Sequence, residues 1–448
     1  MYQDRIQQLD KLPRDRRRRL DLFYREAAER HNGAWRGKGY SGEDYREPGH
    51  PYQFDLNILG EGSLFEYLAT ARTEAGRRAL AAHLLHPVSA DEARARQAAV
   101  RELSALPDLR EAVATLGETT YSDCNADAAN AWLTMAPANF PSWLAPLALL
   151  TSSALALLLI VALLALVPWK VAVPYLAGLL IWHGLLAYVH QSQVRPLLKA
   201  GFELEPEIAI LHDGLSLLAR QSFTAPKLQQ LQRRAAALPA DLRRLRRLTH
   251  WAREREKEYF YAPSMYLFIG TQLAIRLEGW RTTHGAHLQE AIAIWSEFEA
   301  LEALGTYAFE HPGDVYPEFC EQTAFIAEGL GHPLLDAEAC VRNDARFDAD
   351  PRFWIISGSN MAGKSTLLRS IGISVVLAHA GAPVRATRLT LAPLQVFASI
   401  SIPDSLLDGT SRFKAEVDLV RDAIAGAAQA PSLFLIDELF SEIGRAHV

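Results

Sequence analysis

The clearest hydrophobic pattern is a pair of apolar runs in the middle of the chain. The first run, residues 144–167, would form a helix about 36 Å long, and the second covers residues 171–189. Between Asp127 and Arg195 the only charged side chain is Lys170, which stands between the two runs. Trp and Tyr side chains lie near the ends of the runs, where such rings favour a bilayer interface. The pattern predicts a transmembrane helical hairpin, and the alternative is a buried hairpin in a large soluble core.

A polar side chain interrupts the second run. His183 lies near its middle, and a titratable group at that depth of a membrane is a candidate functional residue. The alternative, which we favour, is a neutral histidine hydrogen-bonded to Thr151, Ser152 or Ser153 of the neighbouring helix.

Helical periodicity occupies the chain on both sides of the hairpin region, residues 143–190. Residues 1–53 read as a polar helical segment, and residues 54–130 as the first part of a helical core that begins after Gly60 and Gly62. Residues 191–331 predict long helices, with breaks expected at Pro226, Pro239, Pro263, Gly279–Trp280 and His311–Pro312.

The pattern changes at Pro333 to short β-rich runs that alternate with helices. We expect strands at residues 353–357, 389–398 and 433–437, and helices at residues 367–380 and 413–428. This alternation predicts an α/β domain with a largely parallel sheet.

Charge and cysteine content narrow the classes of function. The net charge of −6 excludes a chain that is basic overall, so any nucleic-acid contact must come from local patches. Cys124, Cys320 and Cys340 have neither a disulfide-framework nor a zinc-site spacing, and they favour a reducing compartment. Arginine is concentrated in residues 14–19 and 233–257. A solvated helix face or contact with anionic lipid would explain the second cluster. The candidates for DNA phosphate contacts are Arg243, Arg244, Arg246 and Arg247.

One motif carries specific chemistry. Residues 358–365 fit the phosphate-loop pattern G-x4-G-K-[ST], after a predicted strand and before a predicted helix. Its glycines let successive backbone N–H groups point at a phosphate chain, to which the helix N-terminus adds partial positive charge. Lys364 would neutralise the β- and γ-phosphates, and the Ser365 hydroxyl would complete a Mg²⁺ shell. The predicted ATP-binding residues are Gly358, Ser359, Asn360, Met361, Ala362, Gly363, Lys364, Ser365 and Thr366.

A pair of carboxylates supplies the second half of this chemistry. Asp437 and Glu438 directly follow the apolar run Leu433–Ile436. Asp437 would hold Mg²⁺ with Ser365, and Glu438 would polarise the attacking water as a general base. Together with Lys364 as a catalytic residue, the two motifs predict Mg²⁺-dependent ATP hydrolysis.

These motifs resemble those of the MutS family of DNA mismatch-repair ATPases. The specific part is the Asn360–Met361 pair inside the phosphate loop. The likeness covers about residues 54–115 and 290–441, and its further segments are Asp55–Leu68, Gly331–Leu334 with Asn343–Asp344, and Asp404–Glu416. The resemblance implies a multidomain protein. It would have a mainly α-helical core and lever region with a transmembrane hairpin, followed by an α/β P-loop ATPase domain of the ABC type at residues 332–441. It also implies ATP and Mg²⁺ as cofactors, a homodimer in the full-length protein, and DNA as a partner.

Three departures from the family pattern shape the expected function. Only about fifty residues precede the core, so a mismatch-reading domain is not expected. The hairpin is similar to that of the membrane-associated MutS-like ATPases of bacteria, which places the protein in the inner membrane with its ATPase domain in the cytoplasm. The chain ends soon after the carboxylates, so we expect an incomplete ATPase domain with impaired turnover and a non-native tail at residues 442–448.

The sequence leaves competing functions open. The favoured function is a membrane-tethered MutS-like ATPase that binds DNA and is related to mismatch repair. The alternative is a membrane-anchored ABC-type ATPase that acts on a protein or lipid client without DNA. A transporter fits less well, because two spans per chain make a poor permeation pathway.

Overall fold

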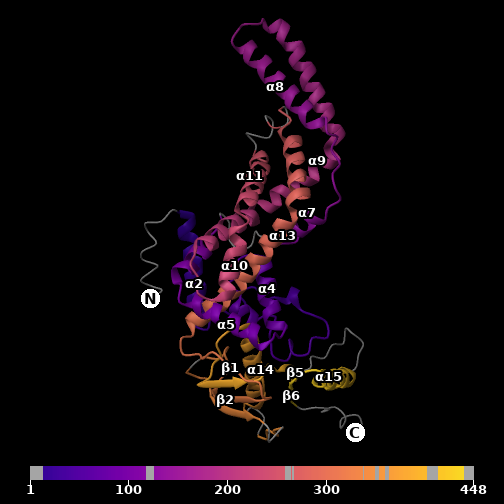
Figure 1. Cartoon of the computed structure of the whole chain (residues 1–448). Coiled ribbons are helices and arrows are strands. Elements are labelled where there is room, and N and C mark those ends of the chain that lie inside the picture. Colours follow the sequence, from indigo (N-terminus) through magenta and orange to yellow (C-terminus); the bar gives the residue numbers. More distant parts are fainter. Residues whose placement is uncertain are drawn as a thin grey trace. The chain divides into compact units, whose positions relative to one another are not determined.

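The computed structural model describes residues 14–117, 126–257, 264, 267–336, 338–348, 353–358, 363–400 and 412–437 (Figure 1). Within these ranges the chain is mostly helical with a few short strands, which confirms the predicted helical character. It divides into two compact units, described separately below. Unit 1 comprises Met1–Thr115, Ser222–Leu231 and Ser296–Val448, and unit 2 comprises Leu116–Gln221 and Gln232–Trp295.

The N-terminal helices of unit 1 begin at side-chain caps. Ser63, Thr73 and Ser89 each accept a hydrogen bond from the backbone N–H three residues later, which satisfies one of the amide groups that a helix start leaves unpaired. The helix expected after Gly60 and Gly62 is confirmed. The helices are α2 (Arg14–His31), η2 (Glu43–Tyr45, a 3-10 turn), α3 (Leu64–Leu68), α4 (Glu74–Leu85), α5 (Ala90–Ser104) and α6 (Pro107–Ala114).

A buried carboxylate ties the start of α4 to the last turns of α13 (Ile269–Glu310). Glu299 is fully buried, and it accepts hydrogen bonds from the backbone N–H groups of Arg72 at 3.3 Å and Thr73 at 3.2 Å. Gly76 makes this close approach possible, because a Cβ there would lie 2.8 Å from Glu299 Cβ. A single anionic side chain thus positions the first turn of α4.

The strands of unit 1 form two sheets. The four-stranded sheet has the order β1-β4-β2-β3, and β2 runs antiparallel to both of its neighbours. The expectation of a largely parallel sheet is therefore wrong for this sheet, in which only β1 and β4 are parallel. The second sheet pairs β5 and β6 in parallel. The strands are β1 (Glu318–Phe319), β2 (Phe325–Leu330), β3 (Asn343–Phe347), β4 (Arg388–Leu391), β5 (Gln395–Ser399) and β6 (Ser432–Ile436).

Two of the three predicted strands need correction. Residues 389–398 are not one strand but β4 and β5 in different sheets, because Pro393 between them lacks the N–H that a continuous ladder needs. Residues 353–358 form no strand, and the side chains of Phe353 and Ile355 are 73% and 86% exposed. An apolar strand is stabilised by neighbours that cover it, and no described strand pairs with this segment. The third strand is confirmed as β6.

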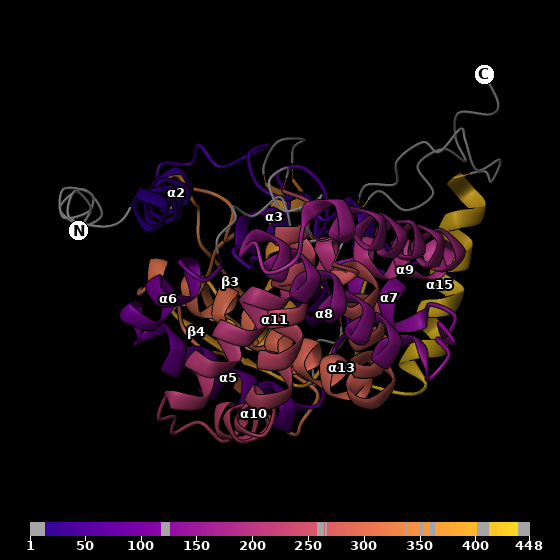
Figure 2. The same ribbon diagram turned by 90° about the horizontal axis from the view of Figure 1, so that it is seen from above.

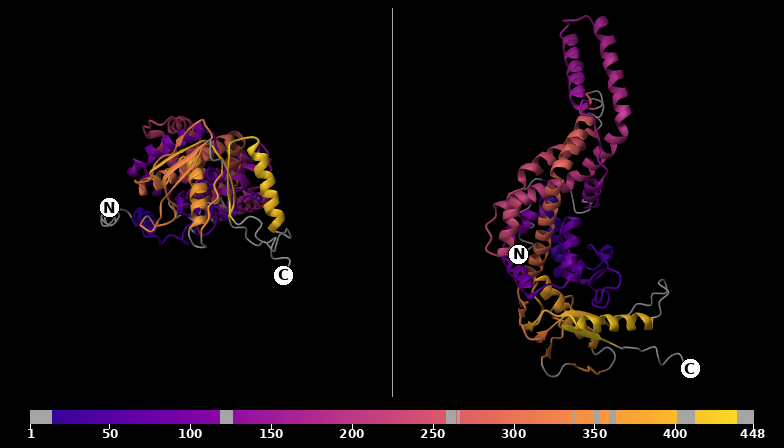
Figure 3. Two further views of the ribbon diagram at one scale, coloured as in Figure 1. Left: turned by 90° about the horizontal axis from the view of Figure 1, so that it is seen from below. Right: turned by 45° about the vertical axis from the view of Figure 1, so that its right-hand side comes forward.

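The two helices predicted in this region are confirmed. They are α14 (Lys364–Ala380) and α15 (Arg412–Ala427). Both contact β5 and β6 (Figure 3). Gly372 lets α14 approach the sheet closely, since a Cβ there would lie 2.7 Å from a methyl carbon of Leu435 in β6.

Unit 2 is built around one very long helix. It contains α7 (Ala126–Thr134), α8 (Leu144–Leu163), α9 (Trp169–Arg220), α11 (Pro239–Arg255) and the first part of α13, while α10 (Pro226–Ala236) has residues in both units. The helices α7, α8 and α11 each contact α9 (Figure 2). The second apolar run continues as helix far beyond its expected end at residue 189.

Most of the expected helix breaks are present. Pro226 and Pro239 are the first residues of α10 and α11, and α13 ends just before His311–Pro312, whereas Pro263 lies outside the described residues. The break expected at Gly279–Trp280 is wrong, because α13 continues through it. Trp280 is buried there and stacks on Trp132 with 6.0 Å between ring centroids, and this packing outweighs the weak helix propensity of glycine.

Two described helices, α8 and α9, are long and apolar enough to cross a membrane by length and composition. Only 28% of the apolar window of α8 and 17% of that of α9 are buried. Leu150, Leu163 and Ile181 are each about two-thirds exposed or more. A core helix of a soluble protein would be mostly buried, so this hairpin presents an unusually large apolar surface.

Candidate functional site

The end of β6 and the beginning of α14 bring two oxygen-bearing side chains together in unit 1. Asp437 follows the last residue of β6, and its backbone N–H donates to the Ser399 carbonyl at the end of β5 over 2.8 Å. Ser365 lies in the first turn of α14, and its hydroxyl donates to Asp437 Oδ2 over 2.5 Å. A hydroxyl beside a carboxylate is a hard-oxygen donor set of the kind that Mg²⁺ prefers. The predicted metal pair is thus assembled from residues distant in sequence.

The segment before α14 has the backbone conformation that a tight turn into a helix needs. Gly363 has φ 83°, in the left-handed region where glycine carries no Cβ penalty. The half-buried Lys364 directs its ammonium back over the preceding loop, and Nζ donates to the Gly358 carbonyl over 2.8 Å. The lysine side chain, the N-terminal dipole of α14 and Ser365 therefore all belong to the first turn of this helix.

Part of the predicted site lies outside the described residues. Of the predicted ATP-binding residues the structure places Gly358, Gly363, Lys364, Ser365 and Thr366. The residues that lie outside it are Ser359, Asn360, Met361, Ala362 and the predicted general base Glu438.

Asp55 is a supporting residue whose role the sequence did not reveal. Its carboxylate accepts a hydrogen bond from the Ile400 N–H over 2.6 Å, just after β5, and its carbonyl accepts one from Arg369 Nε of α14 over 2.9 Å. The Asp55–Leu68 segment thereby fixes the helix and the strand that carry Ser365 and the partner of Asp437. The only signal available was that this segment shares the resemblance described above.

A half-buried histidine near Arg369 adds no positive charge to this region. Burial lowers the pKa of His332 to about 4, and the charges of Arg369, Arg385 and Arg36 act in the same direction. His332 is therefore neutral near pH 7, and its carbonyl accepts a hydrogen bond from Arg385 over 3.2 Å.

In unit 2, His183 has the hydrogen-bonded arrangement that we favoured. It is buried, and its Nε2 lies 2.9 Å from Thr151 Oγ1. The Thr151 hydroxyl itself donates to the Leu147 carbonyl over 2.9 Å. The hydroxyl must therefore accept from the Nε2–H of the imidazole, and this contact joins α8 to α9.

The four arginines of α11 are not equivalent. Leu242, Leu245 and Leu248 form the buried face of the helix, and the side chains of Arg243, Arg244 and Arg247 are exposed. Arg246 is instead half-buried, and its Nη1 lies 2.5 Å from Asp213 Oδ1. The pKa of the Asp213 carboxyl is lowered. Burial acts to raise it, but the hydrogen bond from His212 and the charge of Arg246 outweigh that effect. Arg246 is thus a poor candidate for a phosphate contact.

Comparison with known proteins finds one matching family model and several similar proteins. Residues 354–446 match the family model of MutS domain V. The chain is 30% identical to the DNA mismatch repair protein MutS of Staphylococcus haemolyticus, over 43% of this chain and 22% of the relative. It is 33% identical to MutS of Chlorobium limicola, over 42% and 22% respectively. It is 35% identical to MutS of Geobacillus kaustophilus, over 34% and 17%. The chain therefore spans about a fifth of the length of the curated relatives that it matches.

Proposed function

We propose that this chain is a membrane-tethered ATPase which contacts DNA through its helical region. The premise is that the chain is a MutS family protein over the part that its relatives cover. The observation that carries the ATPase part is the Ser365–Asp437 hydrogen bond at the N-terminus of α14. The general relationship to DNA mismatch repair proteins rests on the sequence similarity to the MutS relatives described above.

The described part of the site fits a Mg²⁺–ATP complex. Lys364 would exchange the Gly358 carbonyl for the β- and γ-phosphates, while the first amides of α14 donate to the same phosphate chain. Ser365 and Asp437 would hold the cation, whose chemistry is to neutralise charge on the phosphate oxygens. Glu438, next in sequence, would orient and polarise the attacking water.

The exposed apolar surface of α8 and α9 supports the membrane tether. In water, burying such side chains is worth about 25 cal/mol per Å², so a hairpin that leaves most of its surface exposed calls for an apolar environment. A bilayer supplies it. Cytoplasmic ATP then requires both ends of the hairpin to face the cytoplasm, at the inner membrane of a bacterium.

DNA contact is proposed through Arg243, Arg244 and Arg247, whose side chains are exposed on α11. Such contacts reach the phosphate backbone and carry no base information. The alternative client is a protein or lipid without DNA. It is favoured by the net charge of −6 and by the engagement of Arg246 with Asp213. A homodimer, as in the resemblance, would complete the proposal.

Nucleotide binding tests the ATPase part directly. A fluorescent ATP analogue with Mg²⁺ should bind the parent chain, and Lys364→Ala should lose this binding because the charge that faces the phosphates is gone. Arg421→Gln, which removes a 68%-exposed charge on α15, is the matched control and should bind as the parent does. In the full-length protein, Glu438→Gln should keep binding and lose turnover. Tight binding by Lys364→Ala would disprove the site.

A further inference from the structure

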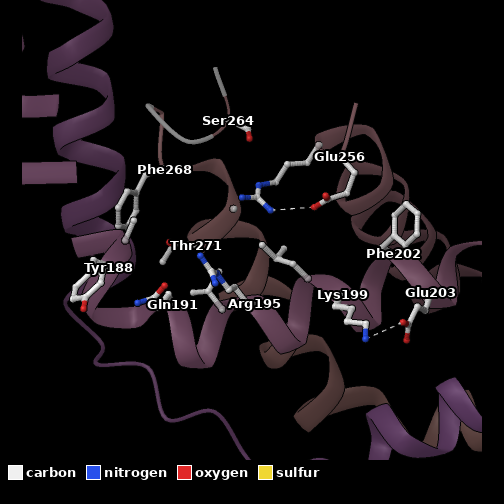
Figure 4. Close-up of a pocket in the computed structure, with 15 residues that line it drawn as sticks. Tyr188, Gln191, Arg195, Lys199, Phe202, Glu203, Glu256, Ser264, Phe268 and Thr271 are labelled. Atoms are coloured by element: carbon white, nitrogen blue, oxygen red, sulfur yellow. Dashed lines mark hydrogen bonds and ion pairs between the residues drawn. The ribbon is translucent and has the colours of Figure 1, made fainter. Parts of the chain in front are cut away.

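A cavity of about 680 Å³ lies in unit 2 at the base of the apolar hairpin. Its walls come from α9 between Ala187 and Glu203, from the end of α11 at Arg255 and Glu256, and from the beginning of α13 (Figure 4). The apolar run of α9 ends at Val189, so the cavity opens where that run gives way to polar sequence.

One end of the cavity is cationic. Lys199 Nζ lies 3.7 Å from Glu203 Oε1, and Arg255 Nη1 lies 3.4 Å from Glu256 Oε1. Each of these two cations therefore has a carboxylate neighbour. Arg195 has none among the described residues, and Figure 4 draws Gln191 and Thr271 beside it. Three cations against two carboxylates leave the lining with a net charge of +1.

The other end of the cavity is apolar and aromatic. Tyr188 and Phe268 line it together with Ala187, Val194 and Leu198. Tyr188 is 70% exposed, and the neighbouring large apolar side chains Leu185 and Val189 of α9 are 55% and 60% exposed. The apolar end therefore continues into the exposed apolar surface of the hairpin.

The direction of α9 points the cations toward that surface. Side chains on a helix lean toward its N-terminus, and the N-terminus of α9 lies in the hairpin. Arg195 stands six residues after Val189, which is about 9 Å along the helix axis. A long side chain that leans back from that position reaches the polar layer at the edge of a bilayer, which adds about 5–8 Å on each side of the hydrocarbon.

Gly270 contributes to the shape of the cationic end. A Cβ at this position would lie 2.9 Å from Arg255 Nε and 3.3 Å from a methyl carbon of Leu198. The glycine thus lets the Arg255 guanidinium approach the start of α13 closely, where both residues line the cavity.

We propose that this cavity binds the headgroup of an anionic glycerophospholipid. The headgroup phosphate would lie against Arg195, and the acyl chains would lie along the apolar face of α9 beyond Tyr188. This inference rests on the membrane tether of the proposed function and adds a specific lipid site to it. The net positive lining favours an anionic lipid over a zwitterionic one. In a zwitterionic lipid the headgroup ammonium already offsets the negative charge of the phosphate, which weakens its attraction to Arg195.

The test measures lipid binding to the whole chain in detergent. Native mass spectrometry would follow titration with phosphatidylglycerol, phosphatidylcholine and inorganic phosphate, for the parent and for Arg195→Gln. The matched control is Arg220→Gln, an exposed arginine in the last turn of the same helix, outside the cavity. Phosphatidylglycerol should bind the parent and the control equally and Arg195→Gln about tenfold more weakly, as expected for one lost charge-assisted contact. Arg195→Lys should recover part of the binding.

Three results would overturn the proposal. Equal phosphatidylglycerol binding by the parent and Arg195→Gln removes the role of the cavity. No preference for phosphatidylglycerol over phosphatidylcholine, or binding of phosphate as tight as that of the lipid, removes the anionic lipid as the ligand. Carbonate extraction of membranes that contain the parent separates the two proposals. If the chain resists extraction but shows no lipid preference, only the lipid site is disproved. If the chain is extracted, the membrane tether and the lipid site are both disproved.

Discussion

The arginines of α11 allow a quantitative test of the proposed DNA contact. Each phosphate that a cation neutralises releases counterions and adds about 0.9 to the slope of log affinity against log salt concentration. The double variant Arg243→Gln with Arg244→Gln removes two exposed cations. The slope should therefore fall by about 1.8, and affinity should weaken to a similar extent for all DNA sequences.

The ion pair between Arg246 and Asp213 provides an internal control. Because Arg246 Nη1 is held 2.5 Å from the Asp213 carboxylate, Arg246→Gln should leave the slope nearly unchanged. Asp213→Asn should instead release Arg246 for one further phosphate, which steepens the slope by about 0.9. The two variants alter the same contact, but only Asp213→Asn should change the slope.

Fluorescence anisotropy of a labelled duplex across a salt series would measure these slopes, with circular dichroism to verify that each variant stays folded. An unchanged slope in the double variant would refute phosphate contact by Arg243 and Arg244. A several-fold preference for a duplex with one mispair would refute recognition by backbone contacts alone. If duplex, branched and single-stranded DNA all fail to bind, the alternative with a protein or lipid client replaces the proposal.

Three further predictions follow from buried or apolar positions. Burial raises the pKa of Glu302 to about 7 from its ordinary 4.5. Between these two pH values the carboxyl ionises in the unfolded chain and stays protonated in the folded one, so the free energy of unfolding falls by about 3 kcal/mol as the pH rises. Glu302→Gln should abolish this loss, and a thermal unfolding midpoint that declines with rising pH as steeply as the parent's would contradict it. Gly76→Ala should destabilise the chain by about 1–3 kcal/mol in denaturant unfolding, because the new methyl group meets Glu299, and an unchanged midpoint would argue against that contact. Arginine at both Leu158 and Leu159 should block membrane insertion, at about 2.5–3.5 kcal/mol per charge, and carbonate-resistant membrane protein from this variant would argue against the span.

Features that depend on neighbouring residues were predictable from sequence. The starts of α10 and α11 at Pro226 and Pro239 follow from the fixed φ and missing N–H of proline. The beginning of α14 directly after Gly363 follows from a glycine turn that leads into a helix-forming segment. The two apolar runs predicted α8 and the first part of α9 because their length and composition are local properties.

Features that depend on distant partners were decided only by the tertiary structure. Residues 353–357 have strand-forming side chains, but β6 pairs with β5 in the described sheet and gives this segment no ladder. Helix α13 continues through Gly279 because Trp280 stacks on Trp132, which lies in another part of the sequence. In the arginine cluster, Arg246 differs from its neighbours only because α9 places Asp213 beside it. Likewise, the role of Asp55 depends on Arg369 and Ile400, more than three hundred residues away. Propensity and motif chemistry are encoded within a few residues, whereas strand pairing, burial and ion pairing depend on which distant segments the folded chain brings together.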